Sequence, residues 1–530
     1  MKFLLILMAL LCQATQVLAA AVDVDRQAIT IALSQEPPNL DSSKTTDLVS
    51  FFVIGHVNEG LVRYDRRGQL APAVAESWEA SGNTLTFRLR RDARWSDGSA
   101  VVADDFVYAW RRLNDPDNAS PYASIAYPVL NAEAIQKGEK PLDSLGIRAI
   151  DSHTLEVRLE RPCGYCVSLT AHAAFYPIKQ AFAERKGALY GAEPEHLLYN
   201  GPFMLTSWTH GASLKMVKNP GYWNRDEITL NEIDVGYITE ENRARLNLFR
   251  DNAIALAKLG ADTVADAASD GLRMRTFASG GLAFLRLNVR EDRLFRDQRL
   301  RQAFQLIFDP EVFVNKVIGI PGYRPAYSLF PAWLPGADSS FIEEHPPARQ
   351  AYDPAKARAL VDQVRAANGG EVPALTILTV TSPTGARIAE YFQGIARQHL
   401  GLEVRVDQQT FKQYLDKTIT GDFDMALSSW YPDFNDVVTY ADLLASWNGN
   451  NRGKYDNPEY DRWLKVLQSS NDQQERMAAA AELQRIIFTD VPVIPMAETG
   501  SAYVQHPQLK GVVRRVLGAD PDYTRARVVP

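Results

Sequence analysis

The stretch of sequence that decides the fold lies near the C-terminus. Residues 402–433 read LEVRVDQQTFKQYLDKTITGDFDMALSSWYPD. Alternating apolar residues predict strands over 402–407 and 423–429, and apolar residues at helical spacing predict a helix over 411–419 between them. A strand–helix–strand unit of this kind has parallel strands and a right-handed crossover. Because ligands bind beyond the carboxyl ends of such strands, the segment that starts at Trp430 is predicted to lie in a binding crevice.

The same succession of strand and helix patterns continues along the chain. Alternation of apolar and polar residues predicts further strands over 84–89, 154–159, 213–217 and 375–380. Apolar residues at helical spacing lie between them, as over 106–113. Interleaved strands and helices predict an α/β fold with mixed sheets.

Length and composition are those of a large folded protein. With 530 residues the chain is long enough for about two to four domains. Its 46% hydrophobic and 23% charged residues are ordinary globular usage, which leaves little room for disorder. The 57 Lys and Arg against 64 Asp and Glu leave a formal charge of −7. A nucleic-acid partner is therefore not expected, since phosphate backbones require a positive field.

The N-terminus has the layout of a secretory signal. Lys2 precedes an apolar run over 3–11, and small residues follow up to Ala21. We predict a signal peptide over 1–20, cleaved after Ala19 or Ala21, and a periplasmic mature protein. The apolar run is too short for a membrane anchor, which takes about 20 residues. A lipid anchor on Cys12 is disfavoured because no small residue stands directly before it.

Two cysteines remain after that cleavage, Cys163 and Cys166 in the sequence CGYC. Export to an oxidising compartment favours a local disulfide between them. A pair of idle thiols in a loop is one alternative. A thioredoxin-like redox pair is another, but it requires the cysteines to open a helix after a strand, and Pro162 and Gly164 favour a loop.

The catalytic signatures that short motifs reveal are absent from the sequence. It contains no HExxH, no GxSxG, no GxGxxG after a strand and no calcium-binding loop. The eight histidines are scattered, and none stands at metal-ligand spacing from another His or a Cys. We therefore predict no catalytic residues, no metal site and no cofactor, and a function in binding.

Several motifs together resemble a known family. They are AESWE at 75–79, TFRLRRDARWSDGS at 86–99, ADDFVYAW at 103–110 and SWYPDFN at 429–435. In this combination the chain resembles the family 5 extracellular solute-binding proteins, and most closely their oligopeptide-binding branch. These proteins are the ligand-binding components of ABC importers. The likeness extends over nearly all of the chain after residue 21.

The resemblance implies a fold and a division into domains. The expected fold is a two-lobed periplasmic binding protein of type II, from the large cluster with an extra domain, whose mixed sheets are joined by a hinge of strands. Domain I is expected to comprise residues 22–65, 195–280 and 500–530, domain II, the extra domain, residues 66–194, and domain III residues 281–499.

The resemblance also implies which residues hold a ligand. A receptor for many peptides must bind what all peptides share, namely the main chain and the charged ends. Asp433 matches the family aspartate that meets the ligand's α-ammonium. Thr46 and Leu48 on one lobe match strand-pairing positions, as do Ser429, Trp430 and Tyr431 on the other. Side-chain pockets are expected at Tyr122, Phe411 and Trp430.

The carboxylate end of the ligand is where the sequence departs from the family. Members that hold longer peptides have cations where this chain has Ile318 and Leu427, and Arg286 replaces a glutamate in a pocket. Arg286 and Arg387 are candidates for receiving a carboxylate in a bidentate manner. Solvated or structural arginines are the alternative at both positions.

The predicted function is that of a periplasmic receptor for short peptides. It is expected to act as a monomer, to close its lobes around the ligand and to deliver it to the membrane permease of an ABC importer. A non-peptide or modified-peptide ligand, such as a murein peptide, a peptide-like antibiotic, a nickel chelate or haem, is the alternative within this fold. An exported peptidase or a chaperone is the alternative from another class.

Overall fold

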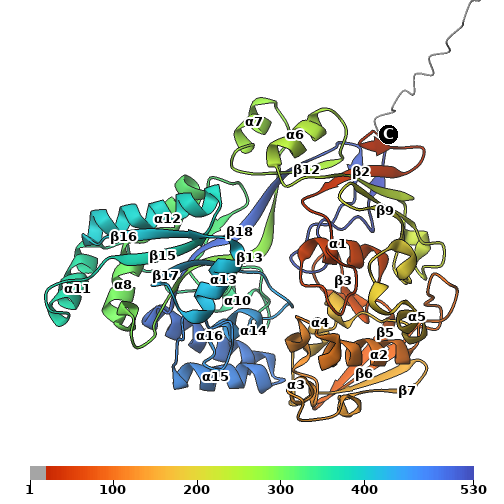
Figure 1. Cartoon of the computed structure of the whole chain (residues 1–530), viewed down its shortest axis with the longest axis horizontal. Coiled ribbons are helices and arrows are strands. Elements are labelled where there is room, and N and C mark those ends of the chain that lie inside the picture. Colours follow the sequence, from red (N-terminus) through yellow and green to blue (C-terminus); the bar gives the residue numbers. More distant parts are fainter. Residues whose placement is uncertain (1–19) are drawn as a thin grey trace, which may run out of the picture.

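The computed structural model describes residues 20–530, apart from the side chain of Pro383. The chain forms two lobes (Figure 1), one built mainly from the N-terminal half and the other from the C-terminal half. Long strands join the lobes at one end, and the lobes approach each other again near α4 (Cys166–Leu169) and α14 (Val438–Ala441). The predicted signal peptide lies, but for Ala20, outside the described residues.

The N-terminal lobe contains a five-stranded mixed sheet. Its order is β1 (Val22–Asp23), β2 (Ala28–Leu33), β11 (Glu232–Ile238), β10 (Ser213–Lys218) and β9 (Phe203–Thr209). Strands β2 and β11 run parallel, and the other neighbours run antiparallel. Helix α1 (Leu48–Val57) packs against β9, so its apolar residues join the core of this lobe.

A four-stranded antiparallel sheet lies in the same lobe. Its order is β5 (Ala75–Ser81), β6 (Thr84–Leu89), β8 (Thr154–Arg158) and β7 (Ile147–Asp151). Helix α2 (Ala103–Asn114) packs on it and begins with two acidic residues, as helix starts favour. The Asp105 carboxylate accepts a hydrogen bond from Trp95 Nε1 at 2.9 Å. Both motif residues are buried, so they contribute to the core around this helix.

The C-terminal lobe is built on a larger sheet. Its order is β12 (Leu256–Leu259), β18 (Val493–Gln505), β13 (Arg275–Leu287), β17 (Met425–Trp430), β15 (Leu375–Val380) and β16 (Val404–Gln409), with β14 (Arg324–Pro325) also paired to β18. The strand–helix–strand unit predicted over 402–429 is β16, α13 (Phe411–Thr420) and β17. Its parallel direction is confirmed, but β15 lies between its two strands and runs parallel to both. Chain order alone does not reveal such an inserted strand.

Helix α13 and the helix that precedes β16 cover opposite faces of the sheet. Ile377 packs in a core with Phe392 of α12 (Pro383–Ile395), and the next residue, Leu378, packs with Tyr414 of α13. Successive side chains of a strand point to opposite faces. The two faces of this sheet therefore pack against different helices. Predicted ligand-binding residues on opposite faces cannot contact the same ligand group.

The strands β13 and β18 join the lobes. Each is 13 residues long, and they pair antiparallel from Arg275 with Tyr503 to Arg286 with Val493. Near β12, the Ala255 N–H donates to the Thr30 carbonyl at 2.8 Å, which ties this sheet to the sheet of the N-terminal lobe. These two long strands, whose pairing is interrupted between Ala278 and Leu282, form the hinge between the lobes (Figure 1).

The predicted division into domains stays a prediction. Shorter elements complete the lobes. They are β3 (Val62–Tyr64), β4 (Leu70–Pro72), α3 (Ala132–Gln136), α5 (Gln180–Lys186), α6 (Asn242–Arg250), α7 (Val264–Ser269), α8 (Gln298–Ile307), α9 (Pro310–Val312), α10 (Phe341–Glu344), α11 (Pro354–Ala367), α15 (Pro458–Ser469), α16 (Gln473–Asp490), β19 (Leu509–Lys510) and β20 (Arg527–Val528). Among the described residues, no helix combines the length and the apolarity that crossing a membrane requires.

The structure joins Cys163 and Cys166 by a disulfide. Cys163 lies in a loop, as predicted, but Cys166 begins the short helix α4, where a loop was expected for both. Both residues are buried, whereas redox-active cysteines are partly exposed. The bond closes the loop that carries Tyr165 toward the other lobe.

We expect the double variant Cys163→Ser, Cys166→Ser to lose about 2 kcal/mol of unfolding free energy, because a disulfide that closes so short a loop removes little chain entropy from the unfolded state. Urea denaturation of the variant and of the oxidised protein measures the difference. Addition of a reductant should lower the stability of the native protein but not that of the double variant. Equal midpoints for all samples would contradict a structural role for the bond.

Candidate ligand-binding site

The two lobes touch through a small set of side chains beyond the hinge. Tyr165 stacks on Phe434 with ring centroids 4.7 Å apart. The Asn435 N–H donates to Ser168 Oγ at 3.1 Å. These contacts join the disulfide loop and α4 to the segment that follows β17. Sequence reasoning did not find this junction, because no local pattern links segments so far apart in the chain.

Asp433 lies at this junction and is largely buried. Its Oδ1 accepts a hydrogen bond from the Tyr122 hydroxyl of the other lobe. Its N–H donates to Thr439 Oγ1 at 3.2 Å, and Trp430 Nε1 donates to the same oxygen at 3.3 Å. Burial raises the pKa of Asp433 to about 6, while the Tyr122 hydrogen bond opposes this shift. No ion pair among the described residues engages this carboxylate, which makes it a candidate partner for a ligand's ammonium.

Strand β17 leads to Asp433 and leaves one edge open. It pairs with β13 over its whole length, from Leu287 with Met425 to Leu282 with Trp430. On the other side its pairing with β15 ends at Ala426. An unpaired strand edge is a template for an added strand. Ser429 is exposed there and Tyr431 is 44% exposed, so the strand-pairing role predicted for Ser429, Trp430 and Tyr431 has a free edge available to it.

The predicted contacts of the N-terminal lobe have a different geometry. Thr46 and Leu48 are both exposed, but neither lies in a strand. Leu48 is the first residue of α1, and the Asp47 carboxylate caps this helix by accepting from Ser50 N–H at 2.8 Å. The free backbone groups here are those of a helix start. Ligand pairing at these two positions stays a prediction.

The aromatic residues predicted to line pockets differ in exposure. Tyr122 is half-buried, and its ring meets His172 edge-on at 5.4 Å. Phe411 is 63% exposed at the start of α13 and stacks on Tyr414 at 6.5 Å. Trp430 is half-buried and packs against the core that both lobes share. Tyr122 and Trp430 therefore lie beside Asp433, whereas Phe411 lies beside Tyr414.

The sheet separates the two arginines predicted to receive a carboxylate. Arg286 is buried on β13 and donates to Ser428 Oγ at 3.3 Å and to the Asn450 carbonyl at 2.7 Å. Ser428 in turn contacts Tyr414 of α13. Arg387 is exposed on α12, which covers the opposite face. The two cannot serve one carboxylate, and only Arg286 shares the face of α13.

A family model described as bacterial extracellular solute-binding proteins, family 5 Middle, matches residues 69–452, which is more than half of the chain. The chain belongs to this family.

Relatives of this family 5 protein match it along nearly its whole length. The periplasmic murein peptide-binding protein MppA of Escherichia coli is 30% identical over 507 residues, covering 94% of this chain and 93% of that protein. A crystal structure of the substrate-binding domain of an oligopeptide ABC transporter from Bacillus anthracis superimposes with a TM-score of 0.80 at 32% identity, covering 95% of this chain and 99% of that one.

OppA of Haemophilus influenzae, crystallised in complex with the peptide RPPGFSPFR, superimposes with a TM-score of 0.78 at 28% identity, covering 96% of this chain and 100% of that one. These likenesses confirm the predicted fold, a two-lobed periplasmic binding protein of the α/β class. The family consists of solute-binding proteins, not enzymes.

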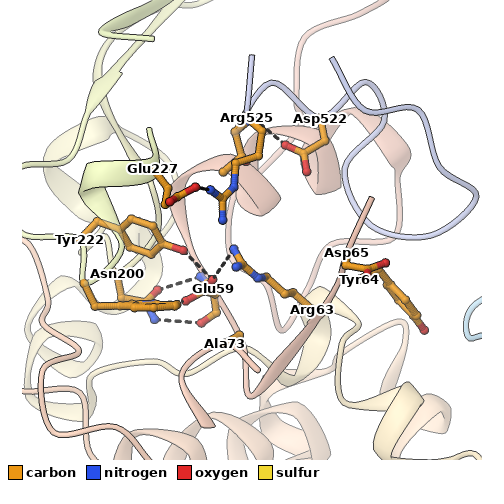
Figure 2. Close-up of polar contacts among 12 residues, drawn as sticks. Glu59, Arg63, Tyr64, Asp65, Ala73, Asn200, Tyr222, Glu227, Asp522 and Arg525 are labelled. Atoms are coloured by element: carbon orange, nitrogen blue, oxygen red, sulfur yellow. Dashed lines mark hydrogen bonds and ion pairs between the residues drawn. The ribbon is translucent and has the colours of Figure 1, made fainter. Parts of the chain in front are cut away.

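This family 5 chain also contains a separate cavity, of about 520 Å³, within the N-terminal lobe. Glu59 lies at its wall (Figure 2) and accepts from the Tyr222 hydroxyl and from Trp223 Nε1, both at 2.7 Å. Burial raises the pKa of Glu59, and Arg63 Nη1 lies 3.7 Å from its carboxylate. None of the ligand-binding residues predicted from the sequence lines this cavity.

Two further ion pairs line this cavity. Arg525 meets Glu227, and Arg515 meets Asp522. Among the described residues, no group of three or more His, Cys, Asp or Glu side chains has a geometry that would hold a metal ion.

Proposed function

We propose that this protein is the periplasmic substrate-binding component of a peptide ABC importer. It binds a short peptide between its lobes, closes around it and presents the closed form to the membrane permease. It acts as a monomer and carries out no covalent chemistry on its ligand. The names of its relatives, which include peptide-binding proteins, support this class of ligand.

The observation that carries the proposal is the pairing of a buried carboxylate with an open strand edge. Asp433 has no cationic partner of its own among the described residues, and the α-ammonium of a peptide supplies one. Beside it, the free edge of β17 can pair with the main chain of an extended ligand. A ligand that binds across the lobes favours the closed state, which is what transport requires.

Native mass spectrometry after incubation with a mixture of peptides tests this function. Intact peptides retained in a one-to-one complex are the expected result. Cleavage products would instead identify a peptidase. A modified peptide is the second candidate ligand, since the relative at 30% identity is named for binding murein peptides; adding murein peptides to the mixture lets the two compete directly.

The pH dependence of binding follows from the environment of Asp433. Because burial raises the pKa of this carboxyl to about 6 in the unliganded protein, it is mostly charged at pH 7.5 and mostly neutral at pH 5. A peptide ammonium requires the charged form, so affinity should rise as the pH rises through about 6. We expect binding at pH 5 to be about tenfold weaker than at pH 7.5. Calorimetry at both values measures this ratio, and Asp433→Asn should abolish it.

A further inference from the structure

Arg286 holds its guanidinium in one orientation on strand β13. Nη1 and Nε are engaged with Asn450 and Ser428, but Nη2 makes no hydrogen bond within the described part of the chain. Burial lowers the pKa of Arg286 to about 10, so the side chain is still positively charged at neutral pH. One N–H face of a buried cation is thus left without a partner.

A second arginine lies close to the first. Arg452 follows Asn450 in the same loop, and its Nη1 is buried without a hydrogen-bond partner. The loop is held against β13, because the Val289 N–H donates to the Gly453 carbonyl at 2.9 Å. Burial is the largest influence on the pKa of Arg286; Tyr414 raises this pKa, and the positive charge of Arg452 lowers it. Because Arg286 Nη1 donates to the Asn450 carbonyl, two residues before Arg452, the two positive side chains belong to one cluster.

No carboxylate balances this cluster. Neither arginine takes part in an ion pair among the residues that the structure describes, and the nearby acids are engaged elsewhere. Asp424 lies 3.7 Å from Arg293 and accepts from the Thr376 N–H at 2.8 Å. Lys417 binds Asp407 and Asp422, at 2.6 and 2.8 Å. A buried cation beside a half-buried one, with no anion to balance them, is unfavourable, in contrast to the ion pairs at the cavity in Figure 2.

The cluster lies on the face of the sheet that leads to the lobe junction. Leu282, Phe284 and Arg286 are every second residue of β13 and therefore share one face of the sheet. Leu282 and Phe284 belong to the core that also contains Phe434. Ser428, which positions Arg286, precedes Asp433 by five residues. An extended chain of that length spans at most about 16 to 18 Å. A short ligand anchored at Asp433 can therefore reach the cluster.

We propose that Arg286 and Arg452 together receive a carboxylate of the ligand, either its C-terminal group or an acidic side chain. Guanidinium groups bind carboxylates through two parallel hydrogen bonds, and Ser428 and Tyr414 keep Arg286 in place for this contact. The inference rests on the proposed function, because it takes the amino end of a peptide to lie at Asp433. It narrows the substrate class to short peptides with a carboxylate within about five residues of that end.

A set of matched ligands tests the proposal on the unaltered protein. Alanine peptides of about three to five residues are compared by calorimetry as free acids and as C-terminal amides, and the amides are also prepared with one alanine replaced by glutamate or by glutamine. We expect the plain amide to bind at least about tenfold more weakly than the best acid. Recovery by glutamate but not glutamine assigns the site to a side chain, and a loss that glutamate does not restore assigns it to the C-terminus.

Variants of the two arginines complete the test. Arg452→Gln and Arg286→Met should each reduce the preference for the carboxylate at least about fivefold while leaving the affinity for the plain amide within about twofold. Arg397→Gln is the matched control, since Arg397 is an exposed arginine on the outer part of the same lobe. Circular dichroism checks that each variant folds; if Arg286→Met does not, Arg452→Gln and the ligand series decide.

The outcomes separate this inference from the proposed function. Equal affinities for acids and amides in the native protein would overturn the carboxylate site and leave peptide binding intact. The carboxylate site would also be overturned if both arginine variants preferred acids over amides as strongly as the native protein does. Failure of every peptide to bind would overturn the proposed function and the inference with it.

Discussion

Replacing Asp433 with alanine is expected to weaken peptide binding about 30- to 5,000-fold, which corresponds to about 2 to 5 kcal/mol. The carboxylate is largely buried, and Tyr122 is its only side-chain partner among the described residues. A peptide ammonium that binds beside Asp433 loses its hydration shell. The charge of the carboxylate offsets the free-energy cost of this dehydration. Isothermal titration with a short peptide measures the loss.

Two further variants show whether charge is the cause. Asp433→Asn retains the shape of the side chain and should lose nearly as much affinity as the alanine variant. Tyr122→Phe removes only the hydroxyl that binds the carboxylate and should cost less. Asp362→Ala, at an exposed aspartate paired with Arg365 on α11, should leave binding unchanged. Unaltered affinity in Asp433→Ala would show that the amino end of the ligand lies elsewhere.

Replacing Arg476 with methionine is expected to lower the free energy of unfolding by about 3 to 5 kcal/mol. Arg476 Nη2 lies 2.6 Å from Asp436 Oδ1, and their side chains are 1% and 6% exposed. The guanidinium also donates to the Leu467 carbonyl at 3.0 Å. Without Arg476, a carboxylate would be left buried and unpaired three residues after Asp433, which should also disturb the lobe junction.

Two further substitutions show how much of the lost stability comes from the buried ion pair of Arg476 and Asp436. Asp436→Asn combined with Arg476→Met removes both charges and should cost less than Arg476→Met alone, since no lone charge is left behind. Arg485→Met, at an exposed ion pair with Glu459, should change stability by less than about 1 kcal/mol. Urea and thermal denaturation give the order of the variants. If Arg485→Met cost as much as Arg476→Met, burial would not be the source of the effect.

Much of the fold was predictable because strand and helix periods are local. The strands over 84–89 and 375–380 coincide with β6 and β15, and the helix expected over 411–419 is α13, which ends one residue later. The binding crevice expected beyond β17 was inferred from the same pattern, because the end of a parallel strand is recognisable from its own residues, and it stays a prediction. The insertion of β15 between β16 and β17 was not, since strand order depends on contacts between distant segments.

The candidate site shows the same limit. Arg286 and Arg387 appeared equivalent as sequence positions, yet one is buried beside Ser428 and the other is exposed on the opposite face. No sequence pattern marked Arg452 as a ligand-binding candidate. Its proposed role depends on its proximity to Arg286 on β13, which only the folded chain shows.

The sequence by itself determined the types of element, the family signature and the aspartate at the end of β17, because each is written in residues that are near one another in the chain. Only the tertiary structure decided that Tyr122 donates a hydrogen bond to Asp433, 311 residues away. The same is true of the cluster of Arg286 and Arg452, which has no carboxylate partner among the described residues. Those contacts depend on how sheets are ordered and how lobes pack, and distant segments are free to combine in many ways until burial selects one.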